Sequence, residues 1–209
     1  MSDDYILLRK KLDEIPVDIT LLDKGELSRY DRLIDPSKKL EFLAGRCFLK
    51  REIATMVDKA PEKIQISLSE NGKPYIESAG SDVYRMKFPH FNLSHDEGTI
   101  VIVFSKFPVG VDLEEKRVLS ADTLRPFFSS RELDILNNMD GNEQQRSLLH
   151  LFTMKEAFIK ATDKKWGLDV ISFDWLQNSW QLQQPSVNCE FHLVENEEFT
   201  TSICLVTGE

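Results

Sequence analysis

The sequence lacks any apolar run of membrane-spanning length. The longest useful one covers only Ile100 to Phe104, whereas a spanning helix needs about 20 apolar residues. The first residues, MSDDYILLRKKL, begin with acids and have no long apolar stretch, so we expect no secretory signal. Cysteine is scarce: Cys47, Cys189 and Cys204 are odd in number and lack metal-ligand spacing. This favours free thiols in a reducing compartment, and we expect a cytoplasmic protein without membrane contact.

Basic charge is also in short supply. With 26 Lys and Arg against 35 Asp and Glu, the formal net charge is -9, which is opposite in sign to the surface of a general nucleic-acid binder. We therefore expect no nucleic-acid partner. Basic residues still gather in one region, at Arg29, Arg32, Lys38, Lys39, Arg46, Lys50 and Arg51. They are either solvated helix charges or part of a pocket for a phosphorylated small molecule.

Apolar residues are frequent enough for a folded core, since 41% of the 209 residues are hydrophobic. A chain of this length can form one large domain or two packed halves. Helical periodicity predicts long helices over 37–58 and 143–162. Alternating patterns and turn signals predict strands near 63–69, 75–76, 99–105, 109–114, 170–176, 188–195 and 199–206.

The two predicted helices share a short sequence likeness. RCFLK at 46–50 matches EAFIK at 156–160 with an offset of 110 residues, although chance also explains so short a match. Antiparallel strands follow both helices, as a duplicated unit requires. We therefore predict an α+β fold of two similar subdomains, 1–107 and 108–209, related by a pseudo-twofold axis. Each would pack an antiparallel sheet against a long helix, and the cleft between them would hold the active site.

Two acidic residues, Asp112 and Glu114, alternate in a predicted strand, so their side chains share one face. They are either a strand end that emerges into water or ligands for a hard cation such as magnesium. A third carboxylate, Glu156, lies four residues before Lys160 on a predicted helix. That pair is either a surface ion pair or part of a ligand cleft, in which the carboxylate binds the cation and the lysine binds phosphate.

The segment FNLSHDEG at 91–98 predicts that Ser94 and His95 lie in a turn before a strand. Without a G-x-S-x-G elbow or a third partner, they do not indicate a hydrolase triad; the hydroxyl and the imidazole can instead bind a phosphate. The tetrapeptide Asn71-Gly72-Lys73-Pro74 predicts a hairpin turn, where glycine allows close backbone approach. The remaining histidines, His90, His150 and His192, are interpreted as structural.

Taken in order, four motifs resemble one family. GKP at 72–74, FNLSH at 91–95, GVDLE at 110–114 and KEAFIK at 155–160 are similar to those of the 4'-phosphopantetheinyl transferases. The likeness is to the longer, pseudo-dimeric type that activates peptide and polyketide synthetases. It implies a monomeric enzyme that transfers the 4'-phosphopantetheine arm of coenzyme A to a serine of an apo carrier protein, and releases adenosine 3',5'-bisphosphate.

The same resemblance implies a metal site and its substrate contacts. Asp112, Glu114 and Glu156 would hold magnesium, or manganese as a substitute, against the pyrophosphate. Lys160 would contact that pyrophosphate, and Asp112 would also face the coenzyme. The carboxylate of Glu132, in FFSSREL, would lie near the attacking serine and accept its proton. The alternative for Glu132 is a capping acid in the first turn of a helix after Ser129 and Ser130.

The resemblance further implies a binding site for the nucleotide end of coenzyme A. Ser94 and His95 would bind it, with His95 at the 3'-phosphate. The Gly72, Lys73 and Pro74 backbone would lie along the adenine. Arg29 and Arg46 would be additional 3'-phosphate ligands.

The carrier partner is expected to be an acidic helical domain. We predict that Leu119, Leu124, Phe127 and Phe128 contribute to its docking surface; the alternative is that they are core residues. No residue identifies the natural carrier, which can serve fatty-acid, nonribosomal peptide or polyketide synthesis. Two other functions stay open: a non-catalytic coenzyme A-binding protein, and another magnesium-dependent nucleotide enzyme, although the chain has no P-loop motif.

Overall fold

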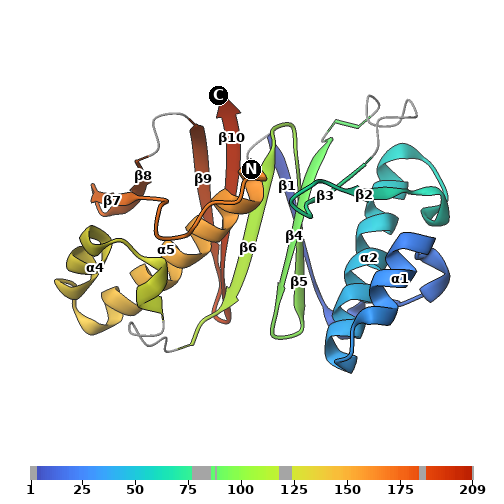
Figure 1. The fold of residues 1–209 in the computed structure, drawn as a ribbon, viewed down its shortest axis with the longest axis horizontal. Helices are drawn as coiled ribbons and strands as arrows, with labels where there is room; N and C mark the ends of the chain where they lie inside the picture. The colour runs from blue at the N-terminus through green and yellow to red at the C-terminus, as the bar shows by residue number, and fades with distance from the viewer. Residues whose placement is uncertain (1–3, 77–85, 88, 118–123, 184–186, 209) are drawn as a thin grey trace. The chain divides into compact units, whose positions relative to one another are not determined.

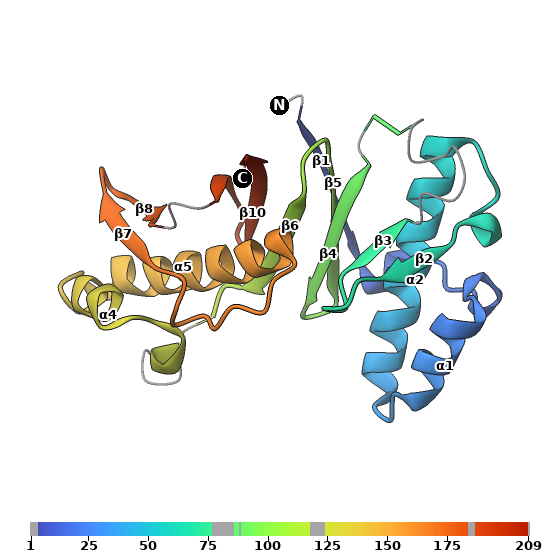
Figure 2. The ribbon, with the colours of Figure 1, turned by 45° about the horizontal axis from the view of Figure 1, so that its top comes forward.

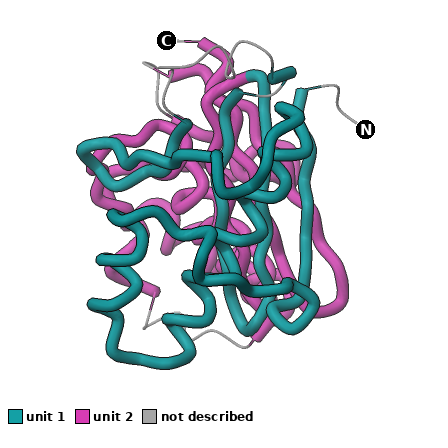
Figure 3. Tube along the Cα trace, turned by 90° about the vertical axis from the view of Figure 1, so that its right-hand side faces the viewer, with its two compact units in different colours: residues 1–106 teal, residues 107–209 magenta. Residues whose placement is uncertain are grey.

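The computed structural model describes residues 4–76, 86–87, 89–117, 124–183 and 187–208 (Figure 1). It divides into two compact units, residues 1–106 and 107–209, which Figure 3 colours separately. Within the described residues, no helix has the length and apolarity needed to cross a membrane.

Unit 1, residues 1–106, is a three-stranded antiparallel sheet with a long helix. The strands β1 (Tyr5–Lys11), β4 (His90–Asp96) and β5 (Thr99–Ser105) pair in the order β1-β5-β4. The helices are α1 (Lys24–Arg32) and α2 (Pro36–Val57), with 3-10 turns at Leu12–Glu14, Ile19–Leu21 and Pro61–Lys63. The strands β2 (Ile66–Leu68) and β3 (Pro74–Ile76) form a separate hairpin. Apolar residues of α2 pack with Phe91, Ile100, Ile102 and Phe104 of the sheet in one core.

Unit 2, residues 107–209, repeats this plan. The strands β6 (Val109–Glu115), β9 (Asn188–Glu195) and β10 (Phe199–Gly208) pair antiparallel in the order β6-β10-β9. The helices are α4 (Ser130–Asn137), after a 3-10 turn at Arg125–Phe127, and α5 (Gly141–Thr162). The strands β7 (Phe173–Leu176) and β8 (Ser179–Leu182) form the second hairpin. Figure 2 shows α5 running alongside β6.

The two units therefore share an element order, and the predicted α+β fold of two similar subdomains is confirmed. Both long helices have 22 residues, an aspartate N-cap (Asp35 and Asp140) and a left-handed aspartate C-cap (Asp58 and Asp163). These ends repeat at an offset of 105 residues. The predicted offset of 110, which paired Arg46 with Glu156, is wrong because it matched five side chains without the helix ends.

A buried lysine–glutamate pair also occurs in both units, with the lysines 105 and the glutamates 106 residues apart. In unit 1, Lys50 on α2 donates to Glu26 on α1 at 2.6 Å and to the Leu21 carbonyl at 2.8 Å. In unit 2, Lys155 on α5 donates to Glu132 on α4 at 2.6 Å and to the Phe127 carbonyl at 3.0 Å. Each glutamate is the third residue of its short helix and completes a capping box. Each lysine thus ties a long helix to the start of a short one.

The sequence-based elements agree with the structure where the periodicity was strong, but the strands β1, β4 and β8 were not predicted. The predicted helices 37–58 and 143–162 are confirmed as α2 and α5. The predicted turn at Ser94 and His95 is wrong, because both residues lie within β4, whose hydrogen bonds to β5 continue to Asp96. The Asn71-Gly72 turn is confirmed, with Gly72 in a left-handed conformation at φ 89° between β2 and β3.

Candidate active site

Unit 1 contains a pocket of about 310 Å³ between one face of α2 and strand β4, within the size range of small-molecule sites. From α2 it is lined by residues three or four apart, which share a helix face: Lys38, Glu41, Phe42, Gly45 and Arg46. The other lining residues are Arg29, Leu33, Gly72, Pro74, Leu93 and His95. The hairpin turn at Gly72 therefore closes one side of the pocket.

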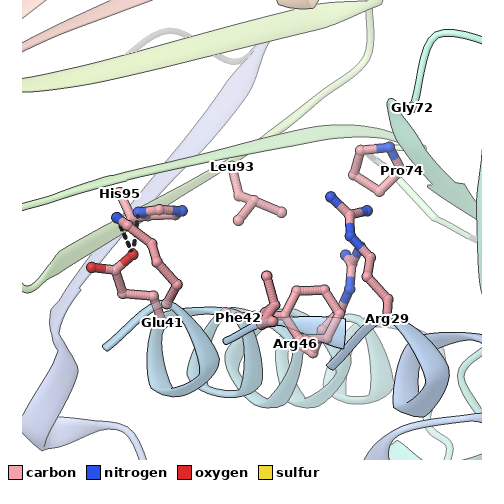
Figure 4. A pocket seen from close by; sticks show the side chains of 11 residues that line it. Arg29, Glu41, Phe42, Arg46, Gly72, Pro74, Leu93 and His95 are labelled. Carbon is pink, nitrogen blue, oxygen red and sulfur yellow. Dashed lines mark hydrogen bonds and ion pairs between the residues drawn. The ribbon is translucent and has the colours of Figure 1, made fainter. Parts of the chain in front are cut away.

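One end of this pocket is cationic. Figure 4 shows the guanidinium groups of Arg29 and Arg46 beside Pro74. Both lie over the Phe42 ring, 5.5 and 5.4 Å from its centroid. Arg46 is also 3.2 Å from a carboxylate oxygen of Glu26. Burial lowers the pKa of Arg46, Glu26 opposes that shift and the Arg29 charge adds to it. Two guanidinium groups that close together favour an anionic ligand.

The other end carries the histidine. The Nδ1 atom of His95 lies 3.3 Å from Glu41, and Lys38 lies 2.7 Å from the same carboxylate. Figure 4 shows Leu93 and Phe42 between this end and the arginines. The pocket thus has two polar ends and an apolar middle. A single 3'-phosphate held by both His95 and the arginines is not what this arrangement favours.

The structure brings together most, but not all, of the predicted nucleotide-binding residues. Arg29, Arg46, Gly72, Pro74 and His95 line the pocket, whereas Lys73 and Ser94 are not among the lining residues. For Ser94 the reason is strand alternation: it points to the opposite face of β4 from Leu93 and His95.

Sequence reasoning missed Glu41, Phe42, Gly45 and Leu93, and treated Lys38 only as a member of a basic cluster. For the pocket residues on α2, the sequence did contain a pattern that could have identified them. Lys38, Phe42 and Arg46 follow one another at intervals of four, so a helix that carries Arg46 toward a ligand carries the other two as well.

Unit 2 carries the acidic residues. Asp112 on β6 is only 4% exposed and accepts a 2.6 Å hydrogen bond from Lys160 on α5. Burial raises the pKa of Glu156, and the Asp112 charge raises it further against the opposing charge of Lys160. These three groups therefore interact electrostatically. Glu114 is partly exposed and lies 3.5 Å from Arg117.

The donor chemistry of this group fits a hard divalent cation. Over the described residues, no three acidic, histidine or cysteine side chains are gathered into a ready-made metal centre. Magnesium, however, usually takes only one or two protein carboxylates and completes its shell with water and substrate phosphates. Burial raises the pKa of Glu156 and the negative charge of Asp112 adds to that shift, so a cation beside both carboxylates would be favourable.

Glu132 does not have the surroundings of a proton acceptor for an incoming serine. Its carboxylate is fully buried and accepts hydrogen bonds from Lys155 at 2.6 Å, from the Ser129 amide at 2.7 Å and from the Phe173 amide at 2.9 Å. All of these bonds belong to the packing of α4 against α5 and β7. The structure thus favours the capping alternative over the predicted catalytic role.

The predicted docking residues are core residues where the structure describes them. Leu124 and Phe128 are 8% and 4% exposed and belong to the core of unit 2, and the partly buried Phe127 packs against that core. Leu119 lies outside the described residues.

Comparison with known proteins gives matches in both units. A family model described as "4'-phosphopantetheinyl transferase, N-terminal" matches residues 11–107, and one for the "4'-phosphopantetheinyl transferase superfamily" matches residues 108–204. The chain is 30% identical over 165 residues to 4'-phosphopantetheinyl transferase psf-1 of Bacillus pumilus, covering 79% of this chain and 66% of that protein.

Two other relatives give similar figures. Sfp of Bacillus subtilis (strain 168) is 31% identical over 164 residues, covering 73% of this chain and 70% of Sfp. HetI of Nostoc sp. is 28% identical over 169 residues, covering 78% and 70%. The matched region thus spans about two thirds of the length of these relatives. The chain belongs to the 4'-phosphopantetheinyl transferase superfamily, in the longer, two-unit type that Sfp represents.

Proposed function

We propose that this protein transfers the 4'-phosphopantetheine arm of coenzyme A to a serine of an apo carrier protein in a magnesium-dependent reaction. The other product is adenosine 3',5'-bisphosphate. The observation that carries the proposal is the cluster of Asp112, Glu156 and Lys160, in which α5 delivers a carboxylate and an ammonium group to a buried aspartate of β6.

The pocket of unit 1 supports the nucleotide part of the proposal. Its two polar ends suit a ligand with two anionic groups separated by a less polar body. In coenzyme A these would be the 3'-phosphate and the 5'-diphosphate, which are attached at different positions of the ribose. The apolar middle at Phe42 and Leu93 would pack against the base, and His95 would bind the 3'-phosphate as predicted from sequence.

In unit 2, Asp112, Glu114 and Glu156 would hold magnesium together with oxygens of the diphosphate. The ion supplies positive charge that stabilises the diphosphate as its bridging bond breaks. Lys160, released from Asp112, donates to the diphosphate. The serine oxygen bonds to the β-phosphorus, the bond from that phosphorus to the bridging oxygen breaks, and the serine proton passes to solvent. Glu132 is assigned no part in this step.

The remaining details follow from the same proposal. Manganese substitutes for magnesium because both take oxygen ligands. The protein acts as a cytoplasmic monomer on an acidic helical carrier. Neither a nucleic acid nor a membrane is a partner.

A mass measurement tests this function. The protein is incubated with coenzyme A, magnesium and each of several apo carriers from fatty-acid, peptide and polyketide synthesis. We expect a phosphopantetheine-sized mass gain on at least one carrier, lost on addition of a chelator and in Glu156→Gln. Coenzyme A binding without a mass gain on any carrier would contradict the transferase and support the non-catalytic binding protein.

A further inference from the structure

Gly110, in strand β6, lies in contact with the backbone of α5. A methyl group built at this glycine would lie 2.0 Å from the carbonyl oxygen of Ala157, 2.4 Å from the amide nitrogen of Ala161 and 2.9 Å from the carbonyl carbon of Lys160. Side-chain carbons essentially never come within 3.0 Å of such atoms. All three are backbone atoms, so no rotamer change relieves the contact. Any side chain here must displace the helix or the strand.

This contact lies next to the proposed chemistry. Gly110 and Asp112 are two residues apart on a strand, so they share the face of β6 that meets α5. Ala157 and Ala161 directly follow Glu156 and Lys160 on α5. The 2.6 Å hydrogen bond between Asp112 and Lys160 spans the same helix–strand gap. The close approach at Gly110 therefore sets the distance across which that bond forms.

A second contact holds α5 on the neighbouring strand. The hydroxyls of Thr153 on α5 and Ser202 on β10 are 2.6 Å apart and buried. Ser202 is the register partner of Asp112. Small side chains, Thr153, Ala157 and Ala161, thus recur every four residues on the face of α5 that meets the sheet. Because the Thr153–Ser202 contact holds α5 at β10, a side chain added at Gly110 would increase the distance between α5 and β6.

We propose that Gly110 is a positioning residue for phosphopantetheinyl transfer, because its missing side chain lets α5 bring Glu156 and Lys160 to Asp112. This inference rests on the function proposed above. A catalytic geometry displaced by about 1 Å can lose about 10²-fold in rate. Gly110 therefore acts through Asp112, Glu156 and Lys160, and touches no substrate itself.

The test substitutes Gly110→Ala, with Gly141→Ala as the matched control because a methyl group at Gly141 meets nothing within 4 Å. We expect kcat to fall by about 10²-fold in Gly110→Ala, with weaker Mn²⁺ binding by electron paramagnetic resonance in the presence of coenzyme A. The affinity for adenosine 3',5'-bisphosphate should stay within about twofold, since its proposed pocket lies in unit 1. The control should match the wild type in all three measurements.

A crystal structure of the Gly110→Ala variant tests the position of α5 relative to β6 without any measurement of activity. We expect α5 to be displaced at Ala157 and the Asp112–Lys160 hydrogen bond to be broken; an unmoved helix with that bond intact would overturn the inference. If the wild type transfers nothing to any carrier, the proposed function fails, and the structural comparison still decides the role of Gly110. If Gly110→Ala does not fold, Ala157→Ser adds one atom on the helix side, and an unchanged Mn²⁺ affinity there would overturn the inference.

Discussion

The two units are built on one plan but hold their long helices at different distances from their sheets. In unit 2, α5 runs in close backbone approach along β6 and β10. In unit 1, α2 makes no comparable approach to β1, β4 or β5 over the described residues. Larger side chains of α2, such as Phe48 and Leu43, belong to the same core as the sheet residues. In unit 2 the close approach is possible because Gly110 has no side chain where α5 meets β6.

The difference in spacing explains the difference in chemistry. The wider gap at the start of α2 leaves a pocket of about 310 Å³ that can take a large ligand. At β6 the helix lies close enough for a 2.6 Å hydrogen bond between Asp112 and Lys160. One repeated frame thus supports a binding pocket in one unit and a compact charged site in the other.

The largest expected effect comes from Glu156→Gln in unit 2. Loss of this carboxylate should lower kcat for transfer by about 10³-fold, while adenosine 3',5'-bisphosphate binding in unit 1 is kept. Kinetics with a competent carrier and calorimetry with the bisphosphate measure the two effects. Glu143→Gln, an exposed change on the same helix, should leave both unchanged. A joint loss of rate and nucleotide affinity would contradict the division between the units.

The same variant has a stability consequence. Burial raises the pKa of Glu156 in the folded state. A group with a raised folded pKa stabilises the fold at low pH, and that contribution is lost as the pH rises through the folded pKa. Glutamine does not ionise, so the Glu156→Gln variant does not lose stability in this way as the pH rises. Chemical denaturation should therefore show the variant to be more stable than the wild type at pH 8, with a smaller difference at pH 5.

The buried lysines Lys50 and Lys155 allow the stability contributed by the same contact to be compared between the two units. Lys155→Met should lower the free energy of unfolding by about 3–5 kcal/mol, because Glu132 is left buried without its cation. Lys50→Met should cost less, since Glu26 keeps Arg46 at 3.2 Å. Urea denaturation followed by circular dichroism measures both.

Tryptophan fluorescence adds a unit-specific measurement. All three tryptophans, Trp166, Trp175 and Trp180, lie in unit 2. Lys155→Met should shift the fluorescence transition to lower urea concentration. A larger loss in Lys50→Met than in Lys155→Met would contradict the role given to Arg46.

A smaller effect is expected from the cationic end of the unit 1 pocket. Arg29→Ala should weaken adenosine 3',5'-bisphosphate binding by about 10-fold, as expected for the loss of a hydrogen bond to a charged group at an exposed position. Arg32→Ala, an exposed arginine on the same helix that does not line the pocket, is the matched control. Equal losses in both variants would indicate a general charge effect instead of a specific contact.

The smallest effect concerns acid stability in unit 2. Burial would raise the pKa of Glu195, but hydrogen bonds from Arg146, His150 and Lys116 outweigh it and lower that pKa to about 2. A lowered folded pKa gives stability above the ordinary value of 4.5 that is lost as the pH falls toward 2. Tryptophan fluorescence between pH 5 and 2 should therefore change less steeply in Glu195→Gln. An identical profile would show that these bonds do not couple to folding.

Prediction from sequence succeeded where a pattern is local. The periodicity of 37–58 and 143–162 predicted both long helices. The metal site at Asp112, Glu114 and Glu156 stays a prediction, although Asp112 is bonded to Lys160 and its charge acts on Glu156. Prediction from sequence was less successful where the surroundings of a side chain depend on residues far away in the chain. Ser94 and Lys73 were expected at the nucleotide pocket but do not line it, and Glu132 was expected at the reacting serine but is bonded to Lys155.

By itself, the sequence determined the two long helices, most of the strands, the fold class and the kinds of side chain available for chemistry, because these depend on backbone periodicity and residue identity within a few positions. Only the tertiary structure decided how far each helix lies from its sheet and which carboxylate each lysine contacts. It also decided that Gly110 is the glycine whose missing side chain allows close contact with the α5 backbone. Those distances depend on the close packing of atoms from segments far apart in the chain. No short pattern of residues specifies that packing.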